Sequence, residues 1–512
     1  MHIDARILEN NTLIEGDICI VGAGAAGITL ALQFLNLPLK VILLEGGGFN
    51  YETAMQDLYK GKNAGLPYYS LESSRLHYFG GTTGHWAGYC SEYDEIDFKK
   101  RDWIPESGWP ITKKDLDEYY HKAAEILELQ TGLPDNNTLG TSLNFDNKVL
   151  RNKMWYFSPP VRFGKKYRET IVNAANIILY TYANVTEIIA DENVAAVKEL
   201  TVKNLAGKQH RVQAKTIILA CCAIQNARLL LASNRQASKG IGNTHDLVGT
   251  RFMEHLEMNA ADLYLPQPAS LDLYRLQFFY TKARAELALT EQTQQESGIL
   301  NGTAALDPVI ISDDKKDEPA SEPSSGAVDS SSDPSASLKG WENAEKYYET
   351  GKYLKEKFNK TKQYMLFTRM EQSPNPLSRI TLDTTSDALG VPRVKLDWQL
   401  TTLEKRSYRK LVEIIGTACG MTGTGRVRLH EWLQDEYDHS WPENLAGGWH
   451  HMGTTRMHKS SKEGVVDENC KVHGMYNLYI AGSSCFPTAG SANPTYTIIA
   501  MTLRLAQHLK SQ

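Results

Sequence analysis

The sequence has few cysteines, and none of them are spaced as C-x-x-C. Seven cysteines are scattered through 512 residues, a pattern that argues against structural zinc and favours reduced thiols in a cytoplasmic compartment. A pyridine-nucleotide disulfide reductase is also disfavoured, because neither a C-x-x-x-x-C redox motif nor a second G-x-G-x-x-G occurs. An excess of charge is equally missing: the net charge of -5 gives no reason to expect a nucleic-acid partner.

Long apolar runs are absent as well. No run approaches the length that a bilayer-spanning helix needs, so we expect no membrane segment. The amino-terminal stretch MHIDARILENN lacks the charged-then-apolar pattern of a secretory signal, which agrees with a cytoplasmic location. What the chain does have is size, because 512 residues, 42% of them hydrophobic, exceed one ordinary domain and can bury a large core.

The segment from Asp17 to Glu45 has the pattern of a dinucleotide-binding unit. An apolar run, Ile18 to Val21, leads into a glycine-rich turn, a helical segment and a second apolar run that ends on Glu45. This order predicts a strand, a turn, a helix and a parallel strand. Three glycines in G-x-G-x-x-G spacing allow the turn, the close approach of a pyrophosphate and tight helix packing: Gly22, Gly24 and Gly27.

The same unit predicts which dinucleotide binds. Backbone N–H groups at the start of such a helix bind phosphate, and an acid about 20 residues further on accepts a hydrogen bond from a ribose hydroxyl. Glu45 has this position. An acid there favours an unphosphorylated ribose, as in FAD or NAD, over NADP.

A second glycine-rich stretch, FGGTTGHWAGYC, covers residues 79–90. Thr82 and Thr83 can hydrogen-bond to phosphate or to a ring edge, and His85 beside Trp86 offers a nucleophilic imidazole next to a flat aromatic ring. Composition alone supports equally well a glycine-rich surface loop with an incidental histidine.

Other segments give a coarse order of elements. Tyr51 to Leu76 has no clear period, and GTRFMEH at 249–255 reads as a loop. Residues 311–339 are rich in Ser, Pro, Asp and Glu and predict a disordered insertion. Strand-like runs are Ile177–Ile189, around Ala195–Val202, Arg211–Ala214 and Thr216–Ala220; helical patterns follow Thr112 and cover 341–358 and 402–419; a strand, a Gly-Ser turn and a helix close the chain at 477–510.

Five motifs in order resemble the glucose-methanol-choline (GMC) oxidoreductases. They are GAGAAG with LLEGGG, GGTTGHW, LACCAIQNARLLL, HHMGTTRM and NLYIAGSSCFPTAGSANPT. Within that family the chain looks most like pyranose 2-oxidase and the large subunits of FAD-dependent sugar dehydrogenases. Residues from about 265 to 364 carry no motif that matches.

The resemblance implies an α/β protein, with a Rossmann-like FAD-binding domain and a discontinuous α+β substrate domain. The ranges predicted for the FAD-binding domain are 1–95, 166–260 and 446–512, the last with the catalytic loops. The ranges predicted for the substrate domain are 96–165 and 261–445.

The resemblance also implies a catalytic pair. His450 heads the H-x-x-G-T motif, and Asn493 lies in the loop before the last helix. A neutral imidazole can take the proton of a substrate hydroxyl, while an amide N–H holds the developing alkoxide and hydride leaves carbon for flavin N5. Without the family, a core or capping role is favoured for His450 and His451, and Asn493 could be only a turn residue. His255 and His458 read as ordinary polar residues.

By the same resemblance, FAD lies across the glycine turn with Glu45 on its ribose and Val185 near its adenine. The implied cofactor-binding residues are Gly22, Gly24, Ala25, Ala26, Gly27, Glu45, Gly46, Gly81, Thr82, His85, Trp86, Val185, Ala220, Gly482, Ser483, Asn493 and Thr495. In pyranose 2-oxidase a similar loop binds the flavin covalently, so His85 is a candidate for that bond. Ala481 stands where classical members have Asp, which leaves flavin contacts there to backbone and hydroxyl groups.

The resemblance predicts oxidation of a secondary alcohol of a sugar, glycoside or polyol to a ketone. Three alternatives stay open: oxidation of a non-sugar alcohol, a redox-neutral lyase on the same fold, and a flavin-binding subunit that acts only with a partner. The electron acceptor is oxygen, a quinone, or a cytochrome or partner subunit. No metal site is expected. Related large subunits sometimes leave the cytoplasm with a signal-bearing partner, so export stays open too.

Overall fold

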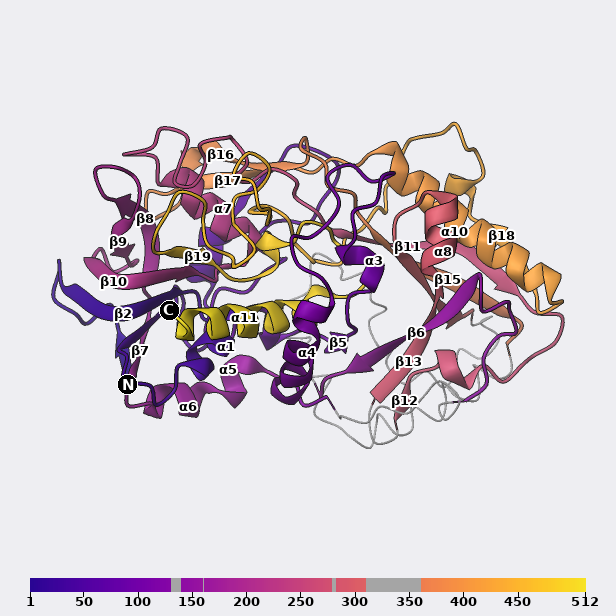
Figure 1. Cartoon of the computed structure of the whole chain (residues 1–512), viewed down its shortest axis with the longest axis horizontal. Helices are drawn as coiled ribbons and strands as arrows, with labels where there is room; N and C mark the ends of the chain where they lie inside the picture. The colour runs from indigo at the N-terminus through magenta and orange to yellow at the C-terminus, as the bar shows by residue number, and fades with distance from the viewer. Residues whose placement is uncertain (130–139, 160, 279–281, 310–360) are drawn as a thin grey trace.

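The computed structural model describes residues 1–129, 140–159, 161–278, 282–309 and 361–512. The predicted insertion at 311–339 and the helix predicted after it lie outside these residues. Two large sheets form the two ends of an elongated molecule, and a small third sheet lies beside the first (Figure 1). The predicted class, an α/β protein with parallel and antiparallel parts, is confirmed.

The first sheet is mainly parallel and contains the predicted dinucleotide-binding unit. Its order is β1 (His2–Asp4), β7 (Ile177–Thr181), β3 (Val41–Leu44), β2 (Leu13–Val21), β10 (Gln209–Leu219), β9 (Val197–Lys203) and β8 (Asn184–Ala190), with β19 (Leu478–Ile480) also on β10. Helices α1 (Ala25–Gln33) and α11 (Pro494–Lys510) pack against each other beside it. The chain therefore ends by returning to the sheet in which it began.

Two strand predictions need correction. The run from Ile177 to Ile189 is two strands, because Tyr182 takes a left-handed conformation with φ of 54° and turns the chain between them. Arg211–Ala214 and Thr216–Ala220 instead belong to one strand, β10. The charged Lys215 interrupts the apolar pattern without ending the strand, because pairing with β2 continues on both sides of it.

The second sheet is antiparallel. Its order is β18 (Arg426–Leu429), β11 (His255–Tyr264), β15 (Gln363–Glu371), β14 (Gly302–Pro308), β13 (Lys282–Leu289), β6 (Leu150–Phe157) and β5 (Tyr89–Cys90), with β12 (Gln277–Phe278) on β13. The long helix α10 (Thr402–Met421) packs on β11 and β15. β5 and the first residues of β11 fall inside the ranges predicted for the FAD-binding domain, yet they pair in this sheet. A sheet can include strands from both predicted domains, so this pairing does not set the domain limits, which stay predictions.

The third sheet joins distant parts of the chain. It contains β16 (Arg379–Ser386), β17 (Pro392–Asp397) and β4 (Gly61–Asn63), and α7 (Cys222–Ala232) packs against β16. β4 lies in the stretch from Tyr51 to Leu76, in which the sequence has no clear period. A strand of three exposed residues is too short to show an alternation of apolar and polar residues. The remaining helices are α2 (Thr53–Gln56), η1 (Asp57–Tyr59), η2 (Gly81–Gly84), α3 (Glu95–Phe98), α4 (Lys114–Ile126), α5 (Phe163–Lys166), α6 (Arg168–Asn173), η3 (Asp272–Tyr274), α8 (Glu291–Ser297), η5 (Glu431–Leu433) and η6 (Ser483–Cys485).

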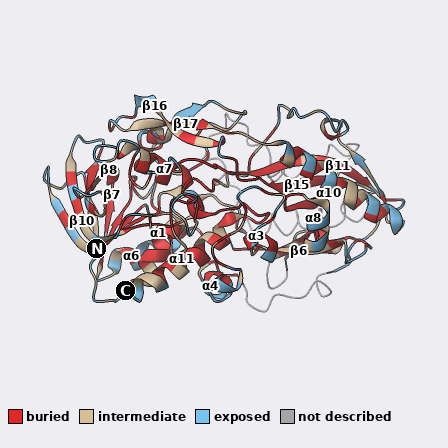
Figure 2. Ribbon diagram, turned by 45° about the horizontal axis from the view of Figure 1, so that its top comes forward, coloured by how far each residue is buried: buried red, intermediate tan, exposed pale blue. Residues whose placement is uncertain are grey.

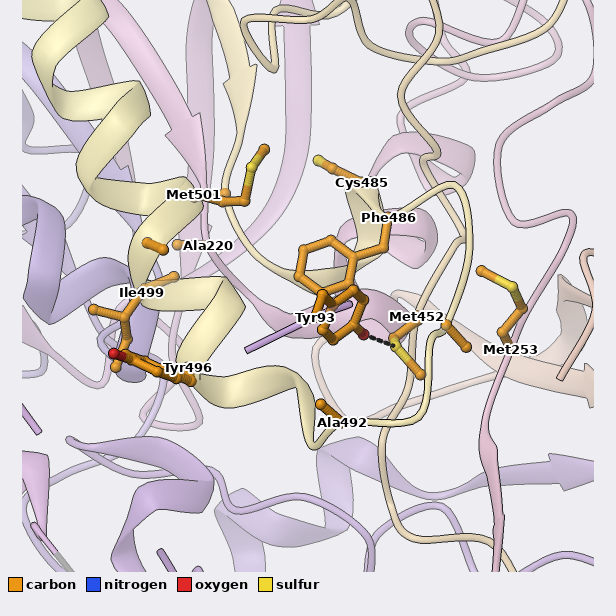
Figure 3. Close-up of a cluster of buried hydrophobic side chains, with 14 of the residues drawn as sticks. Tyr93, Ala220, Met253, Met452, Cys485, Phe486, Ala492, Tyr496, Ile499 and Met501 are labelled. Atoms are coloured by element: carbon orange, nitrogen blue, oxygen red, sulfur yellow. Dashed lines mark hydrogen bonds between the residues drawn. The ribbon is translucent and has the colours of Figure 1, made fainter. Parts of the chain in front are cut away.

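One apolar core continues from the first sheet to the second, and buried residues occupy both ends and the region between (Figure 2). Figure 3 shows the part of this core that packs under the closing loops, where the hydroxyl of Tyr93 lies 3.4 Å from the sulfur of Met452. Phe486 and Ala492 belong to the same cluster. Close packing at this point fixes the two segments that carry His450 and Asn493. Among the described residues, no helix is both long and apolar enough to cross a membrane.

Candidate active site

A cavity of about 490 Å³ runs from the carboxyl ends of β2 and β3 to the start of α11 and the edge of the second sheet. Every residue that the sequence predicted for the site lines this cavity except Gly27. A Cβ at Gly27 would lie 1.8 Å from the carbonyl oxygen of Gly22. Gly27 therefore allows helix packing and does not face the ligand space.

The other two glycines of the turn are required for different reasons. Gly22 has φ of 101°, and a Cβ there would lie 2.7 Å from the carbonyl oxygen of Ala220. Gly24, at the amino end of α1, has no protein atom within 4 Å of its Cβ position. The helix has no acidic residue in its first turn and no side-chain cap. Its positive end thus remains available to an anion.

Glu45 is built into the turn. Its carboxylate accepts hydrogen bonds from the N–H groups of Ala23 at 3.1 Å and Gly47 at 2.9 Å. Burial raises the pKa of Glu45 to about 7. The two oxygens offer about four lone-pair positions, more than the backbone donors occupy, so the carboxyl group can also accept from a ribose hydroxyl.

The loop that carries His85 is tied to the glycine turn. The N–H of Gly80 donates to the carbonyl of Ala23 at 2.8 Å, and the indole of Trp86 donates to the carbonyl of Val161 at 3.0 Å. His85 is half-buried, and its Nε2 has no hydrogen-bond partner among the described residues. Desolvation and the nearby charge of Arg162 together lower the pKa of His85 to about 4. His85 is thus a neutral imidazole with an uncommitted nitrogen.

His450 and Asn493 lie in contact. The amide Nδ2 of Asn493 is 3.1 Å from Nε2 of His450, and its Oδ1 accepts from the indole N–H of Trp155, also at 3.1 Å. Desolvation by the surrounding protein lowers the pKa of His450 well below its ordinary value, and His255 and Arg369 lower it further. His450 is therefore a neutral base that faces an amide donor across one edge of the cavity.

Backbone pairing brings the two residues together. The segment 447–453 runs beside the start of β11, where the N–H of Gly448 donates to the carbonyl of His255 at 3.0 Å. It then runs beside the turn after β19, where the N–H of Gly453 donates to the carbonyl of Ser483 at 3.1 Å. Asn493 caps α11, and Pro494 follows at the first helical position, which Pro favours.

His255 is not the ordinary polar residue that the sequence suggested. It is fully buried, and its Nδ1 lies 2.9 Å from Nδ1 of His450. No local pattern marks this contact, because it depends on pairing between residues almost 200 positions apart. His458, by contrast, lies near Glu463 and away from the cavity.

A buried carboxylate holds the backbone of both histidines. One oxygen of Glu254 accepts the N–H of His255 at 2.9 Å and that of His450 at 2.5 Å. Its other oxygen accepts the hydroxyl of Tyr68 at 2.5 Å, and that hydroxyl is 2.8 Å from Nε2 of His451. Burial raises the pKa of Glu254 to about 8. His451 thus belongs to a separate hydrogen-bonded group rather than to the pair with Asn493.

The wall nearest the second sheet is polar. Arg369 donates to Glu257 at 2.7 Å, and both line the cavity together with Trp449. The indole nitrogen of Trp449 is buried without a partner among the described residues. No local sequence pattern marks this wall, because its residues lie far apart in the chain. Among the residues that the structure describes, no group of three or more His, Cys, Asp or Glu is arranged to hold a metal ion.

The cavity has a glycine turn and a buried acid at one end, and a neutral imidazole beside an amide donor at the other. This arrangement suits a dinucleotide-dependent oxidoreductase. Residues 374–502, which include His450 and Asn493, match the family model described as GMC oxidoreductase. Over this range the chain is similar to the GMC oxidoreductases.

Similar proteins extend this likeness to almost the whole chain. The chain is 22% identical to the 2-methyl-1,2-propanediol dehydrogenase of Mycolicibacterium austroafricanum, over 97% of this chain and 95% of that one. It is also 22% identical to the fructose dehydrogenase large subunit of Gluconobacter japonicus, over 97% and 98%. A solved formate oxidase variant from Aspergillus oryzae, studied for FAD modification, has a TM-score of 0.54 at 15% identity, over 98% and 99%. That structure supports the fold.

Proposed function

We propose that this chain is an FAD-dependent oxidoreductase that oxidises a secondary alcohol of a sugar, glycoside or polyol to a ketone. The observation that carries the proposal is the 3.1 Å contact between His450 and Asn493 in the same cavity as the glycine turn. The names of the diol and fructose dehydrogenases support a polyol or sugar as the substrate. Since 2-methyl-1,2-propanediol has only a primary and a tertiary hydroxyl, oxidation at a secondary carbon rests on the motif resemblance and not on that relative.

The cavity residues fit FAD. Gly24 and the start of α1 would hold the pyrophosphate, Glu45 the ribose and Val185 the adenine end, while Gly482 and Ser483 would lie near the phosphates. Gly482 has φ of 118° and no protein atom within 4 Å of its Cβ position, so its backbone is open to a ligand. Bound FAD would supply the acceptor for a hydride.

His450 and Asn493 would do the proton chemistry. A substrate hydroxyl placed between them accepts from Nδ2 of Asn493 and donates to Nε2 of His450. The hydroxyl proton would move to His450 while hydride leaves the carbon that bears the hydroxyl. The C–O bond then becomes a carbonyl double bond, and the two electrons of the oxidation leave with the hydride. A positioned base of this kind contributes on the order of 10²- to 10⁴-fold to the rate.

We also propose that Nε2 of His85 bonds to the flavin 8α carbon, which its lack of a partner in the protein supports. Bond formation would release the imidazole proton and one methyl proton, and an external oxidant such as oxygen would take up the two electrons. Acid precipitation should leave flavin in the wild-type pellet and release all of it from the H85A variant. Complete release from the wild type would exclude the bond.

The test of the function is anaerobic mixing of the flavin-loaded protein with a panel of sugars, glycosides and polyols. Oxidation predicts bleaching of the flavin absorbance, whereas a lyase would convert its substrate without bleaching. Parallel runs with oxygen and with a dye then identify the acceptor. A flavin-loaded chain that no alcohol reduces, alone or with a partner subunit, would contradict the proposal.

A further inference from the structure

We infer that His255 is a positioning residue that fixes which ring nitrogen of His450 carries hydrogen, so that Nε2 is left bare to act as the base. The inference rests on the proposed role of His450 in alcohol oxidation. It comes from a chain of hydrogen bonds that runs through four side chains and ends on backbone carbonyls: Trp155, Asn493, His450, His255, and the carbonyls of Ala489 and Gly490.

At one end of this series of hydrogen bonds, the backbone carbonyls can only accept a hydrogen bond. Nε2 of His255 lies 3.1 Å from the carbonyl oxygen of Ala489 and 3.0 Å from that of Gly490. Because carbonyl oxygens have no hydrogen to give, Nε2 of His255 must carry one. Burial lowers the pKa of His255 to about 3, so the ring is neutral. Its Nδ1 therefore presents a lone pair to Nδ1 of His450.

At the other end of the series, the indole of Trp155 can only donate a hydrogen bond. The indole N–H of Trp155 donates to Oδ1 of Asn493, which leaves Nδ2 of the same amide facing Nε2 of His450 with one of its two hydrogens. Indole has no acceptor, so the orientation of the amide is set from this side. Nε2 of His450 is thus an acceptor and carries no hydrogen.

The two ends give the same answer independently. Nδ1 of His450 must donate across the 2.9 Å contact to Nδ1 of His255, and Nε2 must be bare. In the alternative tautomer, a hydrogen on Nε2 would face the amide hydrogens of Asn493 and could not receive the substrate proton. An isolated histidine has no such restriction, so His255 supplies what the base needs.

The acceptors of this chain are themselves held in place. Gly490 has φ of 61°, and its N–H lies 3.3 Å from Glu371, which forms a buried ion pair with Arg101. Glu254 accepts the backbone N–H groups of both histidines on one oxygen. The separation of the two rings is therefore set by elements that substitution of His255 leaves intact.

Nitrogen NMR of the holoenzyme tests the tautomer directly. In protein labelled with ¹⁵N-histidine, we expect His450 to show a protonated Nδ1 and a bare Nε2, and His255 to show the reverse. Signals that disappear in the H450Q and H255N variants assign the two rings. A wild-type His450 with hydrogen on Nε2 would overturn the inference, whatever the variants do.

Kinetics of anaerobic flavin reduction give the second test. Leu at position 255 removes the acceptor, whereas Asn places an amide oxygen near the position of Nδ1. We expect H255L to slow reduction about 10²-fold, as loss of a partner that orients a histidine does, and H255N to recover most of the rate at unchanged flavin content. The matched control is His210, another fully buried histidine whose Nε2 bonds to a backbone carbonyl, at 3.0 Å from Ala5; H210L should reduce at the wild-type rate.

The outcomes separate this inference from the function on which it rests. If H450A reduces normally, the proposed function itself fails. If H450A is inactive but H255L and H255N both match the wild type, or are equally slow, only the role of His255 fails. Should H255L not fold, the wild-type tautomer and the H255N rate still decide.

Discussion

The pKa of His450 lies well below the usual range of a histidine. Desolvation, His255 and Arg369 all lower its pKa, and a base must be neutral to accept a proton. The rate of reduction therefore falls only when the pH drops through a pKa that is lower than about 6.5. We expect stopped-flow reduction rates to stay level from pH 8 down to pH 6. A midpoint near 6.5 would show that His450 lies in a more polar site.

Asn493 has one hydrogen-bond donor for the alcohol oxygen, and Trp155 decides that this donor faces the cavity. N493A should slow flavin reduction by about 10²- to 10³-fold, the usual effect of removing one such donor. W155F should have a smaller effect, because the amide is kept but can rotate. Both rates come from the same anaerobic experiment, with flavin content measured by absorbance. Equal rates for N493A and wild type would remove the amide from the mechanism.

The glycine turn shows how one element combines packing and binding. A Cβ at Gly27 meets the carbonyl oxygen of Gly22, whereas a Cβ at Gly24 meets no protein atom within 4 Å. We expect G27A to lower the melting temperature of the apoprotein, because overpacking costs about 1–3 kcal/mol. G24A should leave that temperature unchanged and weaken FAD binding. The reverse pattern in thermal melts and flavin titrations would contradict this division.

The local motifs could be found from the sequence because each works within a short segment. The turn around Gly22, the loop at His85 and the residue before Pro494 keep their geometry in neighbouring residues. His255, Glu254 and the polar wall could not be found from local patterns. His255 and Glu254 come next to His450, and Arg369 next to Glu257, only when the chain around the start of β11 pairs with the segment 447–453 and with β15. The strand break at Tyr182 was missed because a bulky residue there gives no turn signal.

At the scale of the whole molecule, a buried ion pair joins the segment between α3 and α4 to the second sheet. Arg101 donates to both oxygens of Glu371 at 2.7 Å, and both side chains are at most 1% exposed. E371Q should lower the free energy of unfolding by about 3–5 kcal/mol, because it leaves a buried charge without its partner. The exposed pair of Lys99 and Glu291 offers a control. E291Q should change the free energy of unfolding by less than about 1 kcal/mol. Similar effects in denaturant titrations of the two variants would contradict this account.

The central claim is that His450 is the base for oxidation of an alcohol by a bound flavin. Single-turnover anaerobic reduction of the holoenzyme tests it most directly, with H450A compared against H458A, a change of a histidine outside the cavity. The account predicts that H450A keeps its flavin but reduces it on the order of 10²- to 10⁴-fold more slowly, while H458A matches the wild type. A flavin-loaded H450A that an alcohol substrate bleaches at the wild-type rate would contradict it.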